Sequence, residues 1–231
     1  MLQLSESWRA AHPEAHIGIL AMRGVANPRE VPALDARKAA LESELREHLA
    51  GKTRADIKAL PAIQAYTRYY KRFKKTYHVQ HQLESVALKG RDLPRVAALV
   101  EAMFMAELQN LLLTAGHDLD VLTQPVTVHS ADGSETYTGI SGKELALKAG
   151  DMYIADAKGV LSSIIYGPDQ RTKIGAETRS ALFTVYAPAG IAPEDVIAHL
   201  KTIRDLAILI SPEAQVEELK VYSTAVAHTA T

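Results

Sequence analysis

The spacing of hydrophobic and polar positions changes once along this chain, near its middle. Before about residue 115, apolar side chains recur every three or four positions, as they do in helices that pack on a core. After about residue 120 they recur at every second position, as they do in strands. The pattern therefore predicts mainly helices in the first half, and strands with one further helix in the second.

The first half is predicted to hold one short strand and several helices. The strand is HIGILAM, residues 16–22, and the helices cover residues 35–51, 63–77, 79–88 and 96–114. The last of these is the most apolar, with apolar side chains over much of its circumference. Such a helix is buried on more than one side.

The second half is predicted to contain two hairpins, two strands and a helix. VTVHSADGSETYTGI, residues 126–140, indicates a hairpin around Asp132-Gly133, and residues 151–165 indicate a second one. A strand at 181–187, a helix opening at Pro193, and a closing edge strand at 216–223 follow.

These elements predict an α/β (α+β) fold with a mixed, largely antiparallel sheet flanked by helices. A chain of 231 residues can bury a sizeable core. We expect a single domain over residues 1–231, in which 1–60 form a lead-in with helices and 61–215 form the core.

The helix at 63–77 has an aromatic face and a basic face. The aromatic positions are Tyr66, Tyr69, Tyr70, Phe73 and Tyr77, and the basic ones are Arg68, Lys71, Arg72 and Lys75. The aromatic face is interpreted as core-facing. The basic face is either solvated charge or a strip that contacts the phosphates of a single-stranded nucleic acid.

Composition narrows the classes of partner and compartment. The net charge is −1, so contact with nucleic acid requires a local basic patch. The absence of cysteine excludes disulfides and thiolate chemistry. No apolar run approaches the roughly 18–20 residues of a membrane helix. We expect a cytoplasmic protein without membrane or DNA partners.

The sequence shows no nucleophile-elbow, P-loop or dinucleotide-binding pattern, so we predict no cofactor. His78 and His81 have helical ligand spacing but no third partner, and no metal site is predicted. His117, Asp118 and Asp120 are either turn-forming side chains or the wall of a pocket that binds a substrate amine.

Arg171, Thr172 and Lys173 combine two cations with a hydroxyl. This set suits a phosphate, a carboxylate or the end of a charged tRNA, although an ordinary solvated turn is the alternative. Glu177 and Thr178 follow closely and either pair with these cations or cap a turn.

Three segments resemble a known family. YKRFKKTYHVQHQLESVALKGRDLPRVAALVEAMFMAELQNLLLTAGHDLD, YIADAKGVLSS and RTKIGAETRSALFTV are similar to the editing, or B-three/B-four, domain of the phenylalanyl-tRNA synthetase beta subunit. The similarity covers roughly Tyr66 to Val185 and is strongest to the free-standing relatives of that domain.

The resemblance implies an α/β fold around a central cleft that receives a tRNA end carrying a wrong amino acid. The cleft hydrolyses the ester with positioned water and the tRNA's own hydroxyl. Positions that match free-standing relatives are Lys89, Gly90, Leu93, Pro94, Gly116, Asp118, Asp120, Asp156, Gly159, Arg171, Thr172, Lys173, Glu177 and Thr178.

The chain departs from the synthetase pattern at three places. Residues 101–104, Glu-Ala-Met-Phe, replace an aspartate-valine-threonine-asparagine segment. The family's histidine falls near Ala115, and its glutamate falls on Thr184. Editing of tyrosine by the synthetase's own residues is therefore not expected.

Our first hypothesis is a stand-alone protein that binds tRNA or aminoacyl-tRNA and hydrolyses mischarged aminoacyl-tRNA in trans. Its predicted substrate-binding residues are Asp118, Asp120, Arg171, Thr172, Lys173 and Glu177, and its predicted RNA-binding residues are Arg68, Arg72, Lys89 and Arg91. No catalytic residue is assigned. The alternatives are a non-catalytic module for an amino acid or similar small ligand, and a small-molecule hydrolase that uses the same cleft.

Overall fold

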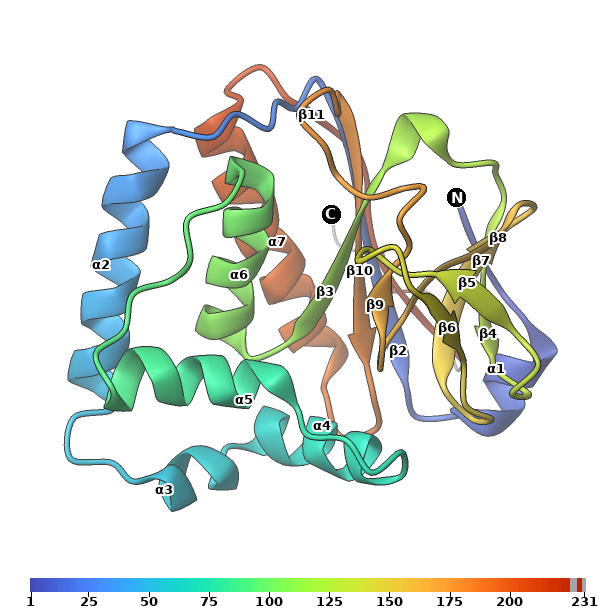
Figure 1. The fold of residues 1–231 in the computed structure, drawn as a ribbon, viewed down its shortest axis with the longest axis horizontal. Helices are drawn as coiled ribbons and strands as arrows, with labels where there is room; N and C mark the ends of the chain where they lie inside the picture. Colours follow the sequence, from blue (N-terminus) through green and yellow to red (C-terminus); the bar gives the residue numbers. More distant parts are fainter. Residues whose placement is uncertain (225–227, 230–231) are drawn as a thin grey trace.

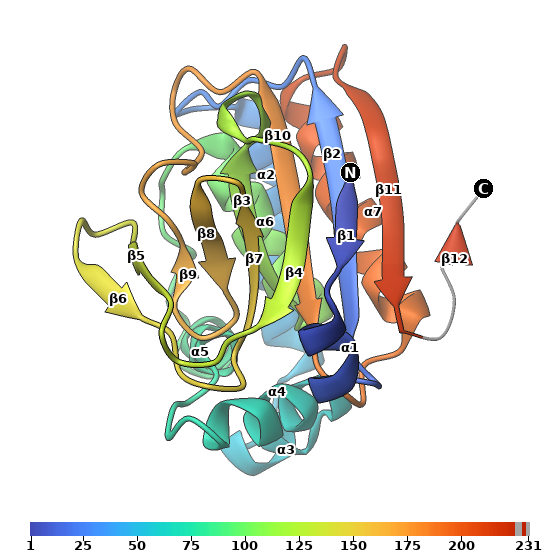
Figure 2. The ribbon, with the colours of Figure 1, turned by 90° about the vertical axis from the view of Figure 1, so that its right-hand side faces the viewer.

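The computed structural model describes residues 1–224 and 228–229 and contains two five-stranded sheets. One of them, called sheet B, contains residues 113–118 and 180–187 and lies in the middle of the molecule. Helices α2 (Pro32–His48), α6 (Ala98–Asn110) and α7 (Pro193–Ile210) cover one side of it, and the second five-stranded sheet, called sheet A, lies on the other side (Figure 1). Helices α3 (Arg54–Ala59), α4 (Pro61–Lys71) and α5 (His78–Leu83) close one end of this arrangement (Figures 1 and 2). Buried apolar side chains from both sheets and the helices form one main core.

Sheet B has the strand order β12-β11-β2-β10-β3, and all neighbouring strands are antiparallel. Its strands are β2 (His16–Arg23), β3 (Leu113–Asp118), β10 (Ser180–Ala187), β11 (Gln215–Ser223) and β12 (His228–Thr229). Every residue of β10 is buried. A strand that is buried on both faces has mostly apolar residues at consecutive positions, which explains the sequence SALFTVYA.

Sheet A has the strand order β1-β4-β7-β8-β9. Its strands are β1 (Leu2–Leu4), β4 (Val126–Ser130), β7 (Met152–Asp156), β8 (Gly159–Ser163) and β9 (Gly167–Pro168). The pair β1 and β4 is parallel and the others are antiparallel. Strands β5 (Thr136–Thr138) and β6 (Glu144–Ala146) form a separate two-stranded ribbon.

Seven α-helices lie within the described residues. They are α1 (Glu6–Ala11), α2 (Pro32–His48), α3 (Arg54–Ala59), α4 (Pro61–Lys71), α5 (His78–Leu83), α6 (Ala98–Asn110) and α7 (Pro193–Ile210). A π-helical turn, η1 (Glu84–Leu88), continues α5, and a 3-10 turn, η2 (Leu119–Val121), follows β3. The α/β class with largely antiparallel pairing is confirmed, in two sheets rather than the one expected.

The predicted helix at 96–114 is too long, because it ends at Asn110 and residues 113–118 form β3. Leu111 has a φ of 62°, in the left-handed region, and its carbonyl accepts a hydrogen bond from the Tyr77 hydroxyl at 3.0 Å. The apolar run continues without a break from helix into strand, so hydrophobic spacing alone does not show the boundary. The helix predicted at 63–77 is also shorter and ends at Lys71.

The hairpin predicted at 126–140 is wrong, because β4 pairs with β1 and β7 while β5 pairs with β6. The chain does turn at Asp132-Gly133, where the Glu135 carboxylate accepts both backbone N–H groups. The two flanking runs then enter different sheets. In addition, β11 is not the outermost strand of sheet B, since β12 pairs with it.

The hairpin at 151–165 is confirmed as β7 and β8, and the strands at 16–22 and 181–187 are confirmed as β2 and β10. The aromatic face of α4 and the turn after it is buried, as expected. Tyr66 donates a hydrogen bond to the Tyr186 carbonyl at 2.5 Å and accepts one from the Leu113 N–H at 2.9 Å. Tyr70 donates to the Ile164 carbonyl at 2.7 Å. Their hydroxyl groups fix α4 to β10, β3 and the segment after β8.

Candidate ligand-binding site

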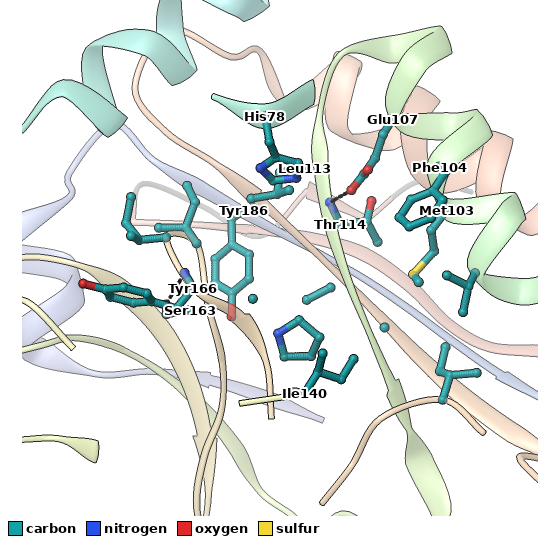
Figure 3. Close-up of a pocket in the computed structure, with 18 residues that line it drawn as sticks. His78, Met103, Phe104, Glu107, Leu113, Thr114, Ile140, Ser163, Tyr166 and Tyr186 are labelled. Carbon is teal, nitrogen blue, oxygen red and sulfur yellow. Dashed lines mark hydrogen bonds between the residues drawn. The ribbon is translucent and has the colours of Figure 1, made fainter. Parts of the chain in front are cut away.

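A pocket of about 390 Å³ lies between α6, β3 and the segment that joins β8 to β9 (Figure 3). Its wall is mostly apolar. The lining residues are His78, Val100, Met103, Phe104, Glu107, Leu113, Thr114, Ala115, Gly116, Ile140, Ser163, Ile164, Ile165, Tyr166, Gly167, Pro168, Ile174 and Tyr186. A cavity of this size and character suits a small ligand with an apolar side chain.

Helix α6 provides one wall through Val100, Met103, Phe104 and Glu107. These positions are spaced by three and four residues, so they share one face of the helix. The opposite wall is formed by β3, which follows α6 directly. The left-handed turn at Leu111 therefore brings the end of the helix and the start of the strand to the same pocket.

Gly116 allows the two walls to approach each other. A Cβ atom at this position would lie 2.6 Å from the sulfur of Met103 and 2.7 Å from Cδ1 of Ile174. Both distances are shorter than real side chains tolerate, so Met103 and Ile174 pack against bare backbone. Any larger residue would push these two side chains into the space of the pocket.

Glu107 is the only carboxyl group among the pocket-lining residues. Its side chain is 3% exposed and accepts a hydrogen bond from the Thr114 N–H at 2.9 Å. Burial raises the pKa of Glu107 to about 8. Its carboxyl is thus mainly protonated at neutral pH, and a bound cation would favour the ionised form.

Two lining residues are exposed and mark the open side of the pocket: His78 and Ile140. Tyr166 also lines the pocket and is partly exposed, with the Lys75 ammonium 5.6 Å from its ring centroid. The pocket thus combines an apolar interior with a half-exposed aromatic ring.

A buried chain of polar side chains runs behind the pocket wall. The Tyr186 hydroxyl lies 2.7 Å from Ser162 Oγ, which lies 3.0 Å from His117 Nε2. His117 Nδ1 lies 2.8 Å from Thr172 Oγ1, which donates to Asp169. Burial first, and then the charge of Arg171, lowers the pKa of His117 to about 3, so its ring is neutral.

This buried chain joins strands of both sheets rather than presenting a nucleophile. Ser162 has no exposed surface, although its hydroxyl meets a histidine as in hydrolytic triads. Its role is to fix Tyr186, which reaches the pocket wall, relative to the segment at 169–173. Thr172 is part of this hydrogen-bonded series. The series connects Thr172, through His117 and Ser162, to Tyr186 in the pocket wall.

The predicted cations of the 171–173 segment differ in their surroundings. Arg171 forms two hydrogen bonds to Asp156, at 2.9 and 3.1 Å, and lies 3.5 Å from Asp169. Lys173 is exposed, and its backbone pairs with His117. None of Arg171, Thr172 and Lys173 lines the pocket between α6 and β3.

The predicted carboxylates also lie beside the pocket rather than on its wall. Asp118 accepts hydrogen bonds from the Thr178 hydroxyl at 2.7 Å and from the Asp120 N–H at 3.1 Å. Asp120 forms an ion pair with Arg23 at 3.2 Å. Glu177 is 93% exposed and lies 3.5 Å from Arg179.

The predicted RNA-binding residues fall into two groups. Arg68 lies on α4, Arg72 caps the C-terminal end of that helix, and both line one shared cavity. Lys89 and Arg91 are exposed in the turn after η1, where Arg46 donates to the carbonyl of Arg91 at 3.2 Å. All four side chains are exposed.

Glu107, Tyr166 and the apolar lining of the pocket are not among the site residues predicted from the sequence. A signal for Glu107 was present, because it is a carboxylate on the inner face of the most apolar helix, and such residues are rarely buried without a reason. The resemblance had placed synthetase editing positions at 101–104 and near 115. Met103, Phe104 and Ala115 do line the pocket.

Within residues 1–224 and 228–229, no group of three or more metal-binding side chains is arranged to hold an ion. No helix in this part of the chain is long and apolar enough to cross a membrane.

Comparison with known proteins identifies related sequences and folds. The family model named B3/4 domain matches residues 62–204. A solved structure, an N-terminal fragment of the phenylalanyl-tRNA synthetase beta subunit from Pyrococcus horikoshii, is similar with a TM-score of 0.52 and 12% identity. The alignment covers 99% of this chain and 53% of that fragment, so the chain spans about half its length. At this identity the similarity shows the fold alone. No curated protein matches the sequence.

Proposed function

The chain belongs to the B3/4 domain family, as its motifs predicted, and from this premise we propose that it binds the aminoacyl end of a mischarged tRNA and hydrolyses the ester in trans. The observation that carries the proposal is the pocket between α6 and β3. It offers an apolar space of amino-acid size with a single carboxyl group in its wall.

In this proposal the pocket recognises the amino acid. The apolar side chain packs against Met103, Phe104 and Ile174, and the α-ammonium group pairs with Glu107. Binding of the ammonium ionises a carboxyl whose pKa is raised to about 8 by burial. A ligand that lacks the ammonium group would bind less tightly, because it offers the Glu107 carboxyl no charged partner.

The nucleotide end stays on the open side of the pocket. The terminal adenine stacks on Tyr166, because a half-exposed aromatic ring beside a lysine suits a base. The exposed Lys173 contacts the RNA. Arg171 and Thr172 do not contact it; their hydrogen bonds, to Asp156 and His117, hold the 171–173 segment in position.

Hydrolysis in this account uses water and the hydroxyl beside the ester, as the family resemblance implies. The oxygen of water forms a bond to the ester carbonyl carbon, and the bond from that carbon to the ribose oxygen breaks. The water's proton is transferred to the departing ribose oxygen. The products are the free amino acid and uncharged tRNA.

Deacylation of a panel of mischarged tRNAs by the purified chain tests this function. We expect turnover on esters of apolar amino acids. Glu107→Gln should raise KM at least about tenfold, the scale of one lost charged contact, and Glu213→Gln, at an exposed carboxylate, should not. Equal activity of Glu107→Gln and the unmodified chain on every ester would contradict the assignment of the pocket.

A second candidate function is a module that binds a free amino acid without catalysis. The pocket favours it because the apolar space and the carboxyl are sufficient to hold an amino acid alone. Binding of an apolar amino acid amide by calorimetry, without turnover of any ester, would support this candidate. A small-molecule hydrolase would instead cleave simple amino acid esters at rates that do not depend on RNA.

A further inference from the structure

A second cavity, of about 220 Å³, lies away from the α6–β3 pocket, between α4, the connection from α1 to β2, and Pro188-Ala189. It shares no lining residue with that pocket. Its polar lining consists of His12, Glu14, Arg68, Tyr69 and Arg72.

Arg68 lies on α4, and Arg72, four residues later, is the residue that caps the C-terminal end of this helix. Neither side chain takes part in an ion pair among the described residues. The Arg72 guanidinium lies over the rings of Tyr69 and Phe73, at 5.3 and 5.4 Å from their centroids. This stacking holds the planar group while its N–H donors stay at the edge. A Cβ atom at Gly190 would lie 2.7 Å from the Arg68 terminal nitrogen, so that guanidinium packs on the backbone beside the cavity.

His12 contributes a buried group that lacks a partner. Its side chain is 6% exposed, and Nε2 has no hydrogen-bond partner among the described residues. Burial and the nearby Arg72 lower the pKa of His12 to about 4, so the ring is neutral and can present one N–H. A buried donor without an acceptor costs free energy, which a ligand oxygen would recover.

We propose that this cavity binds a phosphate group, held by the guanidinium groups of Arg68 and Arg72 and by the Nε2–H of His12. Two guanidinium groups and a neutral N–H match the tetrahedral oxygens of a phosphate better than those of a planar carboxylate. Arg68 and Arg72 were predicted from the sequence as possible phosphate contacts, whereas the position of His12 beside them is known only from the fold.

Two carboxyl groups oppose an anion here. Glu14 lines the cavity and is exposed, so water screens its charge. Asp151 lies behind Tyr69, whose hydroxyl donates to it at 2.9 Å, and burial raises its pKa to about 7. The positive charge of the two guanidinium groups outweighs the negative charge of these two carboxyl groups.

A neighbouring hollow of about 320 Å³ extends the cationic surface. Arg68 lines both hollows, and Lys58 and Lys71 line the second one without any carboxyl group. The source of the phosphate is therefore either the backbone of an RNA, which would follow this surface, or a small free phosphate that occupies the first cavity alone.

Titration of the full chain with inorganic phosphate, followed by the ¹⁵N–¹H signals of the arginine side chains and His12, tests the site directly. We expect saturable shifts at Arg68, Arg72 and His12. The double variant Arg68→Gln, Arg72→Gln should lose the His12 shift, whereas Lys201→Gln, at an exposed lysine of α7, should keep it. Glu14→Gln should tighten binding roughly twofold to fivefold, by removing the opposing charge.

Fluorescence anisotropy with uncharged tRNA distinguishes the sources. For an RNA phosphate, the double variant should bind roughly tenfold more weakly, and its affinity should depend less steeply on salt, by about one unit in the log–log slope. Phosphate shifts with unchanged tRNA affinity would identify a small free phosphate as the ligand.

The proposal is overturned if phosphate causes no saturable shift at these side chains and the double variant binds tRNA like the unmodified chain. The phosphate titration requires neither tRNA nor turnover, so its outcome is independent of the function proposed for the α6–β3 pocket. Loss of deacylation in Glu107→Gln with intact phosphate shifts would separate the two sites.

Discussion

At the scale of single residues, the site depends on a carboxyl group held in an apolar wall. Glu107 is buried beside Met103 and Phe104, and its hydrogen-bond donor from the backbone is the Thr114 N–H. Desolvation outweighs that bond, which is why the pKa rises to about 8 rather than falling. Glu107, which sequence reasoning passed over, is thus a pocket-lining carboxyl whose pKa lies close to neutral pH.

The raised pKa makes folding stability depend on pH through Glu107. Its pKa in the folded chain, about 8, exceeds the ordinary value of 4.5, so the folded state binds its proton more tightly. This contribution is complete below about pH 4.5 and is lost as the pH rises to about 8. Chemical denaturation should show Glu107→Gln gaining roughly 2–4 kcal/mol relative to the unmodified chain between pH 5 and pH 9.

A constant difference between the two proteins across that range would show that Glu107 titrates normally in the folded state. The control is the variant Glu213→Gln, at an exposed carboxylate outside the pocket.

The same carboxyl predicts proton release when an amino acid amide binds. At pH 7 most of the Glu107 population is protonated, and pairing with the ligand's ammonium group ionises it. Calorimetry in buffers of different ionisation enthalpy should report net proton release at pH 7 and net proton uptake at pH 9, where Glu107 is already mostly ionised and the ligand's own amine must gain a proton to bind. No release at pH 7 would exclude Glu107 as the partner of the ammonium group.

Gly116 allows a direct test of the pocket's shape. Gly116→Ala places a methyl group against Met103 and Ile174, whose flexible ends move into the cavity. We expect weaker binding of large apolar ligands, by roughly tenfold, while binding of an alanine amide changes less. Equal loss for both ligands would indicate a general disturbance of the fold.

At the scale of elements, the pocket is made by a helix and the strand that follows it. Sequence spacing predicted a helix here that is buried on more than one side, but it extended this helix into β3, since the apolar run does not break at Leu111. What ends the helix is the left-handed backbone of Leu111 and its bond to Tyr77, from a turn far away in the sequence. A boundary fixed by such a distant contact cannot be derived from local periodicity.

Helix α6 is held from outside by a buried ion pair with α2. Lys38 contacts Glu101, which also accepts the Val96 N–H at 2.7 Å, and both charged side chains are less than 10% exposed. Lys38→Met leaves Glu101 buried without its cation, which should cost roughly 3–5 kcal/mol of the free energy of unfolding.

Urea denaturation with Arg37→Met as the control tests this contact, because Arg37 lies beside Lys38 on α2 but pairs with the exposed Glu44. We expect the control to change stability by less than about 1 kcal/mol. Similar losses in the two variants would mean that the buried pair does not hold α6.

At the scale of the whole molecule, the sequence predicted the α/β class and the family but not how the strands divide into two sheets. The run at 126–130 and the run at 136–138 have the alternation of one hairpin, yet they pair in different sheets. Alternation shows which face of a strand is buried and leaves the choice of partner to tertiary packing. The candidate site depends on that packing, because its wall joins α6, β3 and the segment after β8.

The same limit explains which site residues were predicted. Motif matching identified Arg171, Thr172 and Asp118, whose bonds hold the segments around the pocket. It did not show which residues face the empty space, since that depends on the three elements meeting. The family positions near 103 and 115 indicated where the pocket lies, and the fold shows which side chains line it.

The most direct test of the central claim is to locate the ligand. A crystal structure of the chain with a non-hydrolysable 3′-aminoacylamido-adenosine carrying an apolar amino acid would do so. We predict the amino acid side chain between α6 and β3, its ammonium group at the Glu107 carboxylate, and the adenine on Tyr166. A ligand bound elsewhere on the chain, with the α6–β3 pocket empty, would contradict the account.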